Sequence, residues 1–217
     1  MKQIISKSLQ DMLSKEVILF VLKIGFISFA ITLFLAWNMW GAMSNLITSY
    51  LSWIPWEWLQ TSGASVATFS VAYMLFIIIV ALLTSLNSEK LLIALAKKRY
   101  PEVLVVGSAD IITSILLTLK ASAVFLLLFI ISMPLLFIPI FGQVVILYLW
   151  SVLLKEPTIY DVGALFIDDK TTLKAKRKQT RILAMIAALF NYMPLLNIFA
   201  PVFAQILFLH HILKEEQ

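Results

Sequence analysis

The chain has 217 residues, of which 61% are hydrophobic and 13% are charged, and its mean hydropathy is +0.97. Soluble domains are about 45–50% apolar and about 25% charged, so the composition indicates a protein solvated largely by lipid. The absence of cysteine excludes disulfides, thiolate metal sites and cysteine nucleophiles. The net charge of +5 does not indicate a nucleic-acid partner, because the basic residues flank apolar segments.

The N-terminal segment 2–14 predicts a short amphipathic helix lying on the membrane surface. Its apolar face is Ile4, Ile5, Ser8, Leu9, Met12 and Leu13, and its polar face is mainly Lys2, Gln3, Lys7, Gln10 and Asp11. The basic region is long and contains acidic residues, and no small-residue cleavage site follows. We therefore expect this segment to be retained, not removed as a signal peptide.

Residues 17–40 and 66–86 predict two transmembrane helices. The second segment has no charged residue, and the first has only Lys23, whose ammonium can extend toward the cytoplasmic boundary. Each segment has the ~20 residues that a helix needs to cross about 30 Å of hydrocarbon.

The region between these helices sets the orientation. All 17 Lys and Arg residues lie outside the window from Ile24 to Glu89. The positive-inside rule therefore places residues 41–65 outside and both termini in the cytoplasm of a bacterial-type inner membrane. Five of the six tryptophans lie between Trp37 and Trp58. They predict an aromatic belt along the outer leaflet.

Residues 87–120 are predicted to return to the cytoplasmic face. Lys90, Lys97, Lys98 and Arg99 favour that side, and Pro101 ends a helix or fixes a turn. The mixed part of this segment, residues 103–120, fits either an interfacial helix or the lead-in to the next insertion.

Two further apolar blocks, 121–154 and 182–213, are interrupted by proline. The interruptions are Pro134, Pro139 and Gly142 in the first block, and Asn191, Pro194, Asn197 and Pro201 in the second. The basic segment 155–181 between them has seven Lys or Arg residues, which a single crossing by each block would place outside. We therefore expect each block to enter and leave by the cytoplasmic face.

The lengths of these blocks favour partial insertion. Two complete crossings with a turn need about 40 residues, whereas each arm here has about 12–16 residues and spans about 18–24 Å. The blocks therefore predict two partly inserted helical hairpins. The first would cross fully if residues 103–120 joined its leading arm. Broken helices persist at membrane depth only when buried in protein or lining a wet cavity, which favours a homo-oligomer around a pore.

Polar side chains in and beside the hairpin turns are the candidates for lining such a pore. Within a membrane, unwound backbone and amide groups can coordinate ions or substrate. The same groups can instead cap broken helix ends or form interhelical hydrogen bonds. The candidates are Asn191, Pro194, Asn197, Pro201, Gln143 and Gln205.

The predicted fold class is an all-α polytopic membrane protein, a single domain over 1–217, with two long transmembrane helices and two proline-broken, partly inserted hairpins. No nucleophile–base pair or carboxylate dyad indicates an enzyme. The six glycines form no phosphate-binding loop, and the adjacent His210 and His211 point in different directions on a helix. We expect no metal and no cofactor.

The C-terminal region resembles the CysZ-type sulfate permeases and the etoposide-induced membrane proteins. An arginine-led helix begins at Arg181 and is followed by Pro194-Leu195-Leu196-Asn197, Ala200-Pro201 and an apolar return arm to Leu209. The strings at 97–103 and 160–166 and the overall layout are also similar to this family. The resemblance implies a bacterial inner-membrane homo-oligomer that takes up sulfate for sulfur assimilation.

The chain departs from the family at the start of the first span. CysZ-type proteins carry a Gly-Leu-Arg-type motif there, associated with sulfate binding, whereas this chain has Leu13-Ser14-Lys15-Glu16. Ser14 and Lys15 are the candidates for anion binding, since a helix N-terminus and an ammonium both suit an anion. They also fit an N-cap and an ordinary membrane anchor.

Arg177 and Arg181 could gather anions at a cytoplasmic vestibule, or hold the topology and contact anionic lipid. The favoured function is a passive or ion-coupled permease for sulfate or a related small anion. The alternatives are a non-transporting scaffold or membrane-remodelling protein of the same family, and a channel for another small solute.

Overall fold

The computed structural model describes residues 2–53, 55–136, 138–168, 180–193 and 195–214, which form helices and no strand. In chain order the elements are α1 (Lys2–Met12), α2 (Lys15–Tyr50), α3 (Glu57–Asn87), α4 (Glu89–Arg99), α5 (Ile111–Leu136), α6 (Phe141–Phe166), the helical segment Thr180–Tyr192 ending in the 3-10 turn η1 (Leu189–Tyr192), the 3-10 turn η2 (Leu196–Phe199) and α8 (Ala200–Lys214). The predicted all-α membrane class is confirmed.

Four stretches of the described residues are long and apolar enough to cross a membrane. They are α2, α3, residues Ile111–Ser132 of α5, and Leu196–Leu213, which covers η2 and most of α8. Helix α6 is not among them, and its C-terminal half carries Lys155, Glu156 and Asp161. The structure thus has two more candidate spans than the two long helices expected from sequence.

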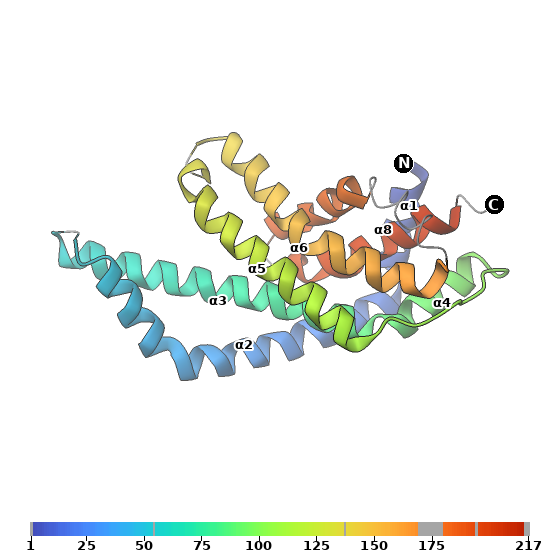
Figure 1. The fold of residues 1–217 in the computed structure, drawn as a ribbon, viewed down its shortest axis with the longest axis horizontal. Helices are drawn as coiled ribbons and strands as arrows, with labels where there is room; N and C mark the ends of the chain where they lie inside the picture. The colour runs from blue at the N-terminus through green and yellow to red at the C-terminus, as the bar shows by residue number, and fades with distance from the viewer. Residues whose placement is uncertain (1, 54, 137, 169–179, 194, 215–217) are drawn as a thin grey trace.

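Helices α2 and α3 form a long arm that projects away from the end of the molecule where α1, α4 and α8 lie (Figure 1). Helix α2 continues ten residues beyond the predicted end at Trp40, and α3 begins nine residues before the predicted start at Val66. The segment expected at 41–65 is therefore mostly helix. Only a short connection after Tyr50 separates α2 from α3.

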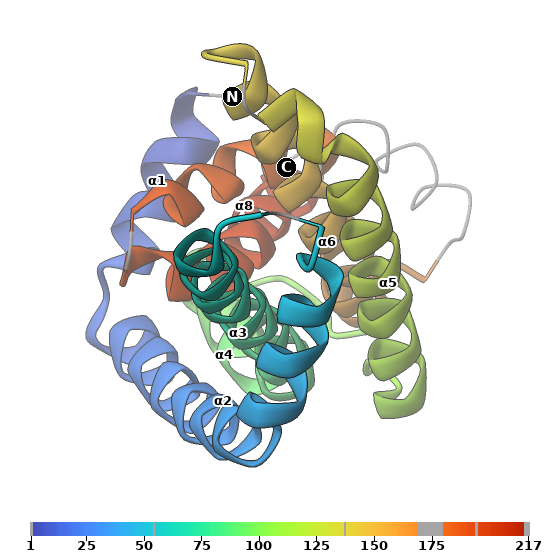
Figure 2. The same cartoon turned by 90° about the vertical axis from the view of Figure 1, so that its left-hand side faces the viewer.

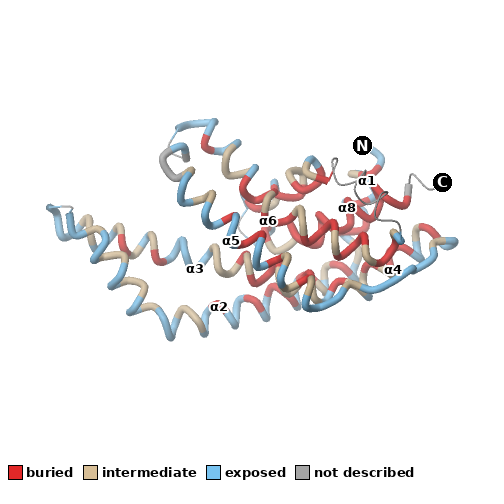
Figure 3. Tube along the Cα trace, in the orientation of Figure 1, coloured by how far each residue is buried: buried red, intermediate tan, exposed pale blue. Residues whose placement is uncertain are grey.

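The buried core lies at the end of the molecule that carries both termini, while the far parts of α2 and α3 are largely exposed (Figure 3). Seen end-on, α8 lies in the middle, with α1, α3 and α6 around it (Figure 2). Of its most apolar stretch, 83% is buried inside the protein, against 33% for α2 and 22% for α3. The apolar side chains of α8 therefore pack mainly inside the protein core, whereas those of α2 and α3 lie mainly on the outer surface.

Helices α5 and α6 pack side by side as a helical hairpin (Figure 1). Each has 26 residues, or about 39 Å of helix. Arms of 12–16 residues are too short for this hairpin. The alternative in which residues 103–120 lengthen its leading arm fits instead, because α5 begins at Ile111. The turn contains Ile140 at φ 65, an unusual conformation for a β-branched residue.

The last hairpin consists of the segment Thr180–Tyr192 and α8, and its turn docks on the side of the α2–α3 arm. Ile198 packs against Gly25 of α2, and the Asn197 amide donates a hydrogen bond to the Tyr73 hydroxyl of α3 at 2.8 Å. Gly25 is ten residues beyond the start of α2 at Lys15, or about 15 Å along the helix. The turn therefore reaches only part of the way along the arm.

Candidate functional site

A buried polar cluster joins α1, α4 and α8 at the base of the molecule. The Asp11 carboxylate, 3% exposed, accepts hydrogen bonds from Arg99 through Oδ1 and from His210 through Oδ2, the latter at 2.8 Å. The second ring nitrogen of His210 lies 2.9 Å from the Tyr100 hydroxyl. The four side chains thus form one continuous hydrogen-bonded chain.

The partners fix how the hydrogens are arranged in this cluster. An ionised carboxylate can only accept, so His210 Nε2 carries a hydrogen and donates it to Asp11. His210 Nδ1 can then accept from the Tyr100 hydroxyl with the imidazole neutral. Both carboxylate oxygens of Asp11 and both ring nitrogens of His210 have partners in this arrangement, so the cluster makes a specific attachment of α1 to α8.

Electrostatics keep Asp11 ionised despite its burial. Burial on its own would raise the pKa of the carboxyl, but the hydrogen bonds from His210 and Arg99 and the positive charge of Arg99 outweigh it, and the pKa lies below its usual value. The polar face predicted for the N-terminal helix therefore does not lie wholly in water at Asp11. Asp11 lies instead on the buried side of α1, with Ile4, Ser8 and Met12, while Leu13 is exposed.

The Asp11 cluster sets the position of the corner between α1 and α2. The backbone N–H of Ser14 donates to the Asp11 carbonyl at 3.0 Å, and the Ser14 hydroxyl accepts from Val17 N at 3.4 Å as the N-cap of α2. Lys15 and Glu16 are exposed in the first turn. The N-terminus of α2, with its free N–H groups, is thus held against a fixed base with an exposed ammonium beside it.

The residues expected in the last hairpin turn lie close together around the two 3-10 turns. Asn197 is 2% exposed, and its amide nitrogen donates a hydrogen bond to the Tyr73 hydroxyl. Asn191 is also buried. Pro201 lies in the first turn of α8, where a missing N–H is tolerated. Pro194 is outside the described residues. Neither the Asn191 nor the Asn197 side-chain oxygen has a hydrogen-bond partner among the described residues.

The remaining candidates are spread over α6, α8 and the segment before α8. Gln205 is buried and donates to Asp161 of α6 at 3.0 Å, whereas Gln143 is exposed and accepts a hydrogen bond from Tyr192 through its backbone carbonyl. The Arg181 guanidinium lies over the Tyr148 ring, 4.9 Å from its centre. Arg177 is outside the described residues. The structure therefore does not bring the six hairpin candidates to one place.

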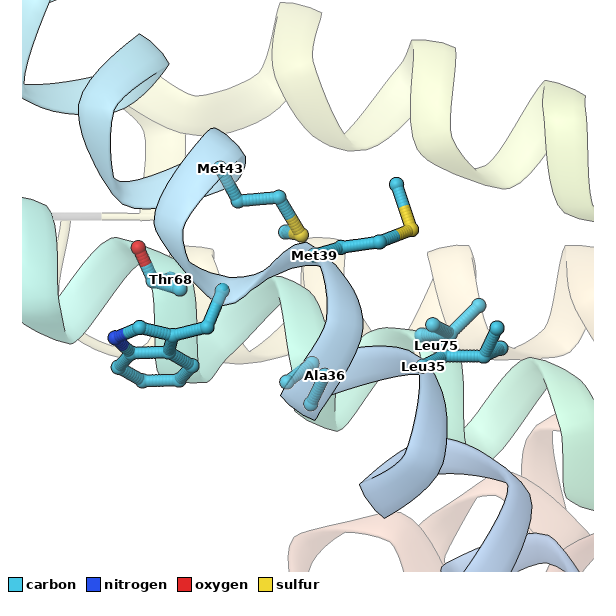
Figure 4. Close-up of a pocket in the computed structure, with 8 residues that line it drawn as sticks. Leu35, Ala36, Met39, Met43, Thr68 and Leu75 are labelled. Carbon is cyan, nitrogen blue, oxygen red and sulfur yellow. The ribbon is translucent and has the colours of Figure 1, made fainter.

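The hollows on the α2–α3 arm are apolar. A small cleft between the two helices is lined by side chains such as Leu35, Met39 and Leu75, and its one hydroxyl, Thr68, is used within α3 (Figure 4). A larger groove of about 1130 Å³ runs between α2, α3 and the last hairpin turn, and no Lys or Arg lines it. These surfaces suit hydrocarbon, not an anion.

Sequence reasoning missed the Asp11 cluster and the pairing of Gln205 with Asp161. Asp11 was assigned to a solvated face, and its partners Arg99 and His210 lie 88 and 199 residues away along the chain. One local signal was present, because a histidine in a largely apolar helix such as α8 needs a polar partner. Among the described residues, no group of three acidic, histidine or cysteine side chains could hold a metal ion.

These features define a polytopic helical membrane protein with a packed base, held together by the Asp11 cluster, and a long apolar arm. The chain belongs to the family described as "Sulfate transporter CysZ/Etoposide-induced protein 2.4", whose sequence model matches residues 4–201. The resemblance drawn from the C-terminal region is thereby confirmed. No curated protein and no solved structure matched the chain.

Proposed function

We propose that this protein is a permease for a small anion in a bacterial inner membrane, with sulfate as the substrate and both termini in the cytoplasm. The observation that carries the proposal is the family match over residues 4–201, because the family description names a sulfate transporter. The matched region contains the whole α1–α2 corner, the α2–α3 arm and the last hairpin turn.

The α1–α2 corner is the proposed place where the anion first binds. It combines the N-terminus of α2 with the exposed ammonium of Lys15, and both favour negative charge. Glu16 opposes this charge, so the corner holds the anion weakly and can release it. Ser14 supports the site indirectly, since its hydroxyl already caps α2.

We propose that the last hairpin is inserted only part-way into the membrane. Its turn contacts Gly25 and Tyr73, which lie part-way along α2 and α3, and does not follow the arm to its tip. The unpaired side-chain oxygens of Asn191 and Asn197 then lie at membrane depth within protein. Such irregular backbone and amide groups are tolerated there only when protein or a wet cavity surrounds them.

A homo-oligomer would supply the missing walls of that cavity. Large apolar side chains such as Phe26, Phe29 and Phe34 are exposed along α2. In a monomer they would all face lipid, and in an assembly part of this surface would face a second copy. Chemical crosslinking of the protein in native membranes should therefore give a ladder of discrete species, and a single monomer band would argue against the assembly.

The function is tested by uptake of radiolabelled sulfate into proteoliposomes at varied pH and membrane potential. The proposal predicts uptake above that of empty liposomes. Lys15→Ala should lower sulfate binding by about tenfold, because it removes a charge-assisted contact. Lys15→Arg should bind at least as tightly as the wild type, since guanidinium contacts two oxygens at once. Lys98→Ala, another exposed lysine, is the matched control.

No sulfate uptake by folded, reconstituted protein would overturn the permease proposal and favour the scaffold alternative. Uptake that is unchanged in Lys15→Ala would keep the permease and remove the α1–α2 corner as its anion site.

A further inference from the structure

A second polar site lies on the opposite side of α3 from the groove, where the end of α3 meets the start of α5. It is a cavity of about 300 Å³, and the polar side chains that line it are Ser85, Ser88, Glu89, Ser108, Ser114 and Asp161. No Lys or Arg lines it. Its mouth opens at the exposed loop before α5, where Ser108 lies.

Asp161 lies at the base of this cavity, only 2% exposed. Its Oδ1 accepts a hydrogen bond from the Ser114 hydroxyl and its Oδ2 accepts one from Gln205, each at 3.0 Å. Each carboxylate oxygen has a further lone pair, so these bonds leave acceptor capacity unused. The described part of the chain gives Asp161 no ion pair. A buried carboxylate without a cation is costly, because neutral donors replace only part of its hydration.

One serine of the same cavity is unsatisfied. The hydroxyl oxygen of Ser88 is buried and makes no hydrogen bond to the described residues, whereas the Ser85 hydroxyl is a hydrogen-bond neighbour of the Asp161 carboxylate. Both line the cavity that contains Asp161, and Ser88 is 1% exposed. Buried polar atoms in a folded protein normally have partners, so the unpaired Ser88 hydroxyl beside a carboxylate without a cation indicates a missing ligand.

The chemistry of the lining selects a small monovalent cation. Every polar side chain in the cavity presents oxygen, and its two carboxylates, Asp161 and Glu89, repel anions. Calcium prefers six to eight oxygen ligands with several carboxylates, and magnesium demands a near-ideal octahedron. One deeply buried carboxylate with neutral hydroxyls gives a weaker field that matches a single positive charge.

We propose that the cavity is a sodium site in which Asp161 neutralises the ion and the hydroxyls of Ser85 and Ser88 coordinate it. The site would tie α3 to α6 and, through Gln205, to α8. The inference rests on these contacts alone and does not depend on sulfate being the substrate.

The test measures the apparent Tm of purified protein while sodium chloride replaces choline chloride at constant ionic strength. The site predicts a saturable rise of about 5–10 °C with sodium and a smaller rise with potassium. Asp161→Asn should abolish the sodium-dependent rise, and Ser88→Ala should shift the sodium midpoint upward by about fivefold or more. Glu102→Gln, which removes an exposed carboxylate outside the cavity, is the control and should behave as the wild type.

A wild-type protein with no rise specific to sodium would overturn the site, and so would an undiminished rise in Asp161→Asn. If Asp161→Asn does not fold, Ser88→Ala provides the test. An unchanged sodium concentration at the midpoint of the Tm rise in that variant would contradict the proposal. Failure of sulfate uptake would leave this result unaffected, so the two proposals can fail separately.

Discussion

Asp11 is the residue on which the base of the molecule most depends. Its carboxylate is shared by Arg99 of α4 and His210 of α8, and all but Arg99 are almost completely buried. Asp11→Ala should lower the free energy of unfolding by about 3 kcal/mol, because it leaves a buried imidazole and a guanidinium without their acceptor. A fall of about 6–12 °C in apparent Tm should accompany it. Gln10→Ala, on the exposed side of α1, should have little effect.

The same carboxylate should make stability depend on pH in a defined window. The pKa of Asp11 in the folded protein lies below the model-peptide value of 3.8. The stabilisation is therefore fully present above about pH 4 and is lost as the pH falls through the folded value. The difference in apparent Tm between wild type and Asp11→Asn should be constant from pH 7 to pH 5 and shrink below pH 4. A difference that persists unchanged at pH 3 would contradict the proposed role of the charge.

Single residues were the hardest feature to predict from sequence. The helical pattern assigned Asp11 to the polar face of the N-terminal helix, whereas the structure places it on the buried side with Ile4, Ser8 and Met12. Pattern alone cannot show that a distant arginine and histidine pair with it there. Gln205 was expected to form either a helix–helix hydrogen bond or part of a pore, and only the position of Asp161 on α6 shows the first of these contacts. Ser14 was predicted from local sequence as a possible N-cap, which needs no distant partner, and the structure shows that cap.

At the scale of elements, the contact between the last hairpin turn and α2 depends on a glycine. A Cβ atom at Gly25 would lie 3.1 Å from Ile198 Cδ1, whereas a Cβ atom at Gly41 would meet nothing within 4 Å. Gly25→Leu should therefore displace the turn. The free energy of unfolding should fall by about 1–3 kcal/mol, with a lower apparent Tm and less sulfate uptake. Gly41→Leu is the matched control, and it should be neutral or slightly stabilising because glycine is a poor helix former.

Equal losses in the two glycine variants would show that the arm itself, and not the docking of the turn, is sensitive to side-chain bulk.

Element existence was easier to predict than element length. The apolar runs 17–40 and 66–86 correctly located two long helices, because hydrophobicity marks the part of a helix that faces lipid. Helix α2 nevertheless continues to Tyr50 and α3 starts at Glu57, since the tryptophan-rich residues between can extend a helix beyond the hydrocarbon. Residues 103–120 fitted either an interfacial helix or the lead-in to the next insertion. The structure favours the lead-in, since α5 begins at Ile111 and continues past the exposed Lys120.

At the scale of the whole molecule, the structure divides into a packed base and an apolar arm. The base holds both termini, the Asp11 cluster and the cavity of Asp161, and the arm exposes large apolar side chains along most of its length (Figure 3). This division matches the charge pattern, since no Lys or Arg occurs between Ile24 and Glu89. We therefore propose that the base lies at the cytoplasmic face and that both hairpins open toward it.

That placement is the claim on which the anion route depends, and the absence of native cysteine makes it directly measurable. Two exposed positions suit single cysteine substitutions. They are Ser52, at the tip of the arm, and Asp168, just after α6. In intact spheroplasts a membrane-impermeant maleimide should label Ser52→Cys and leave Asp168→Cys unlabelled until the membrane is opened. Labelling of Asp168→Cys in intact spheroplasts would contradict the arrangement.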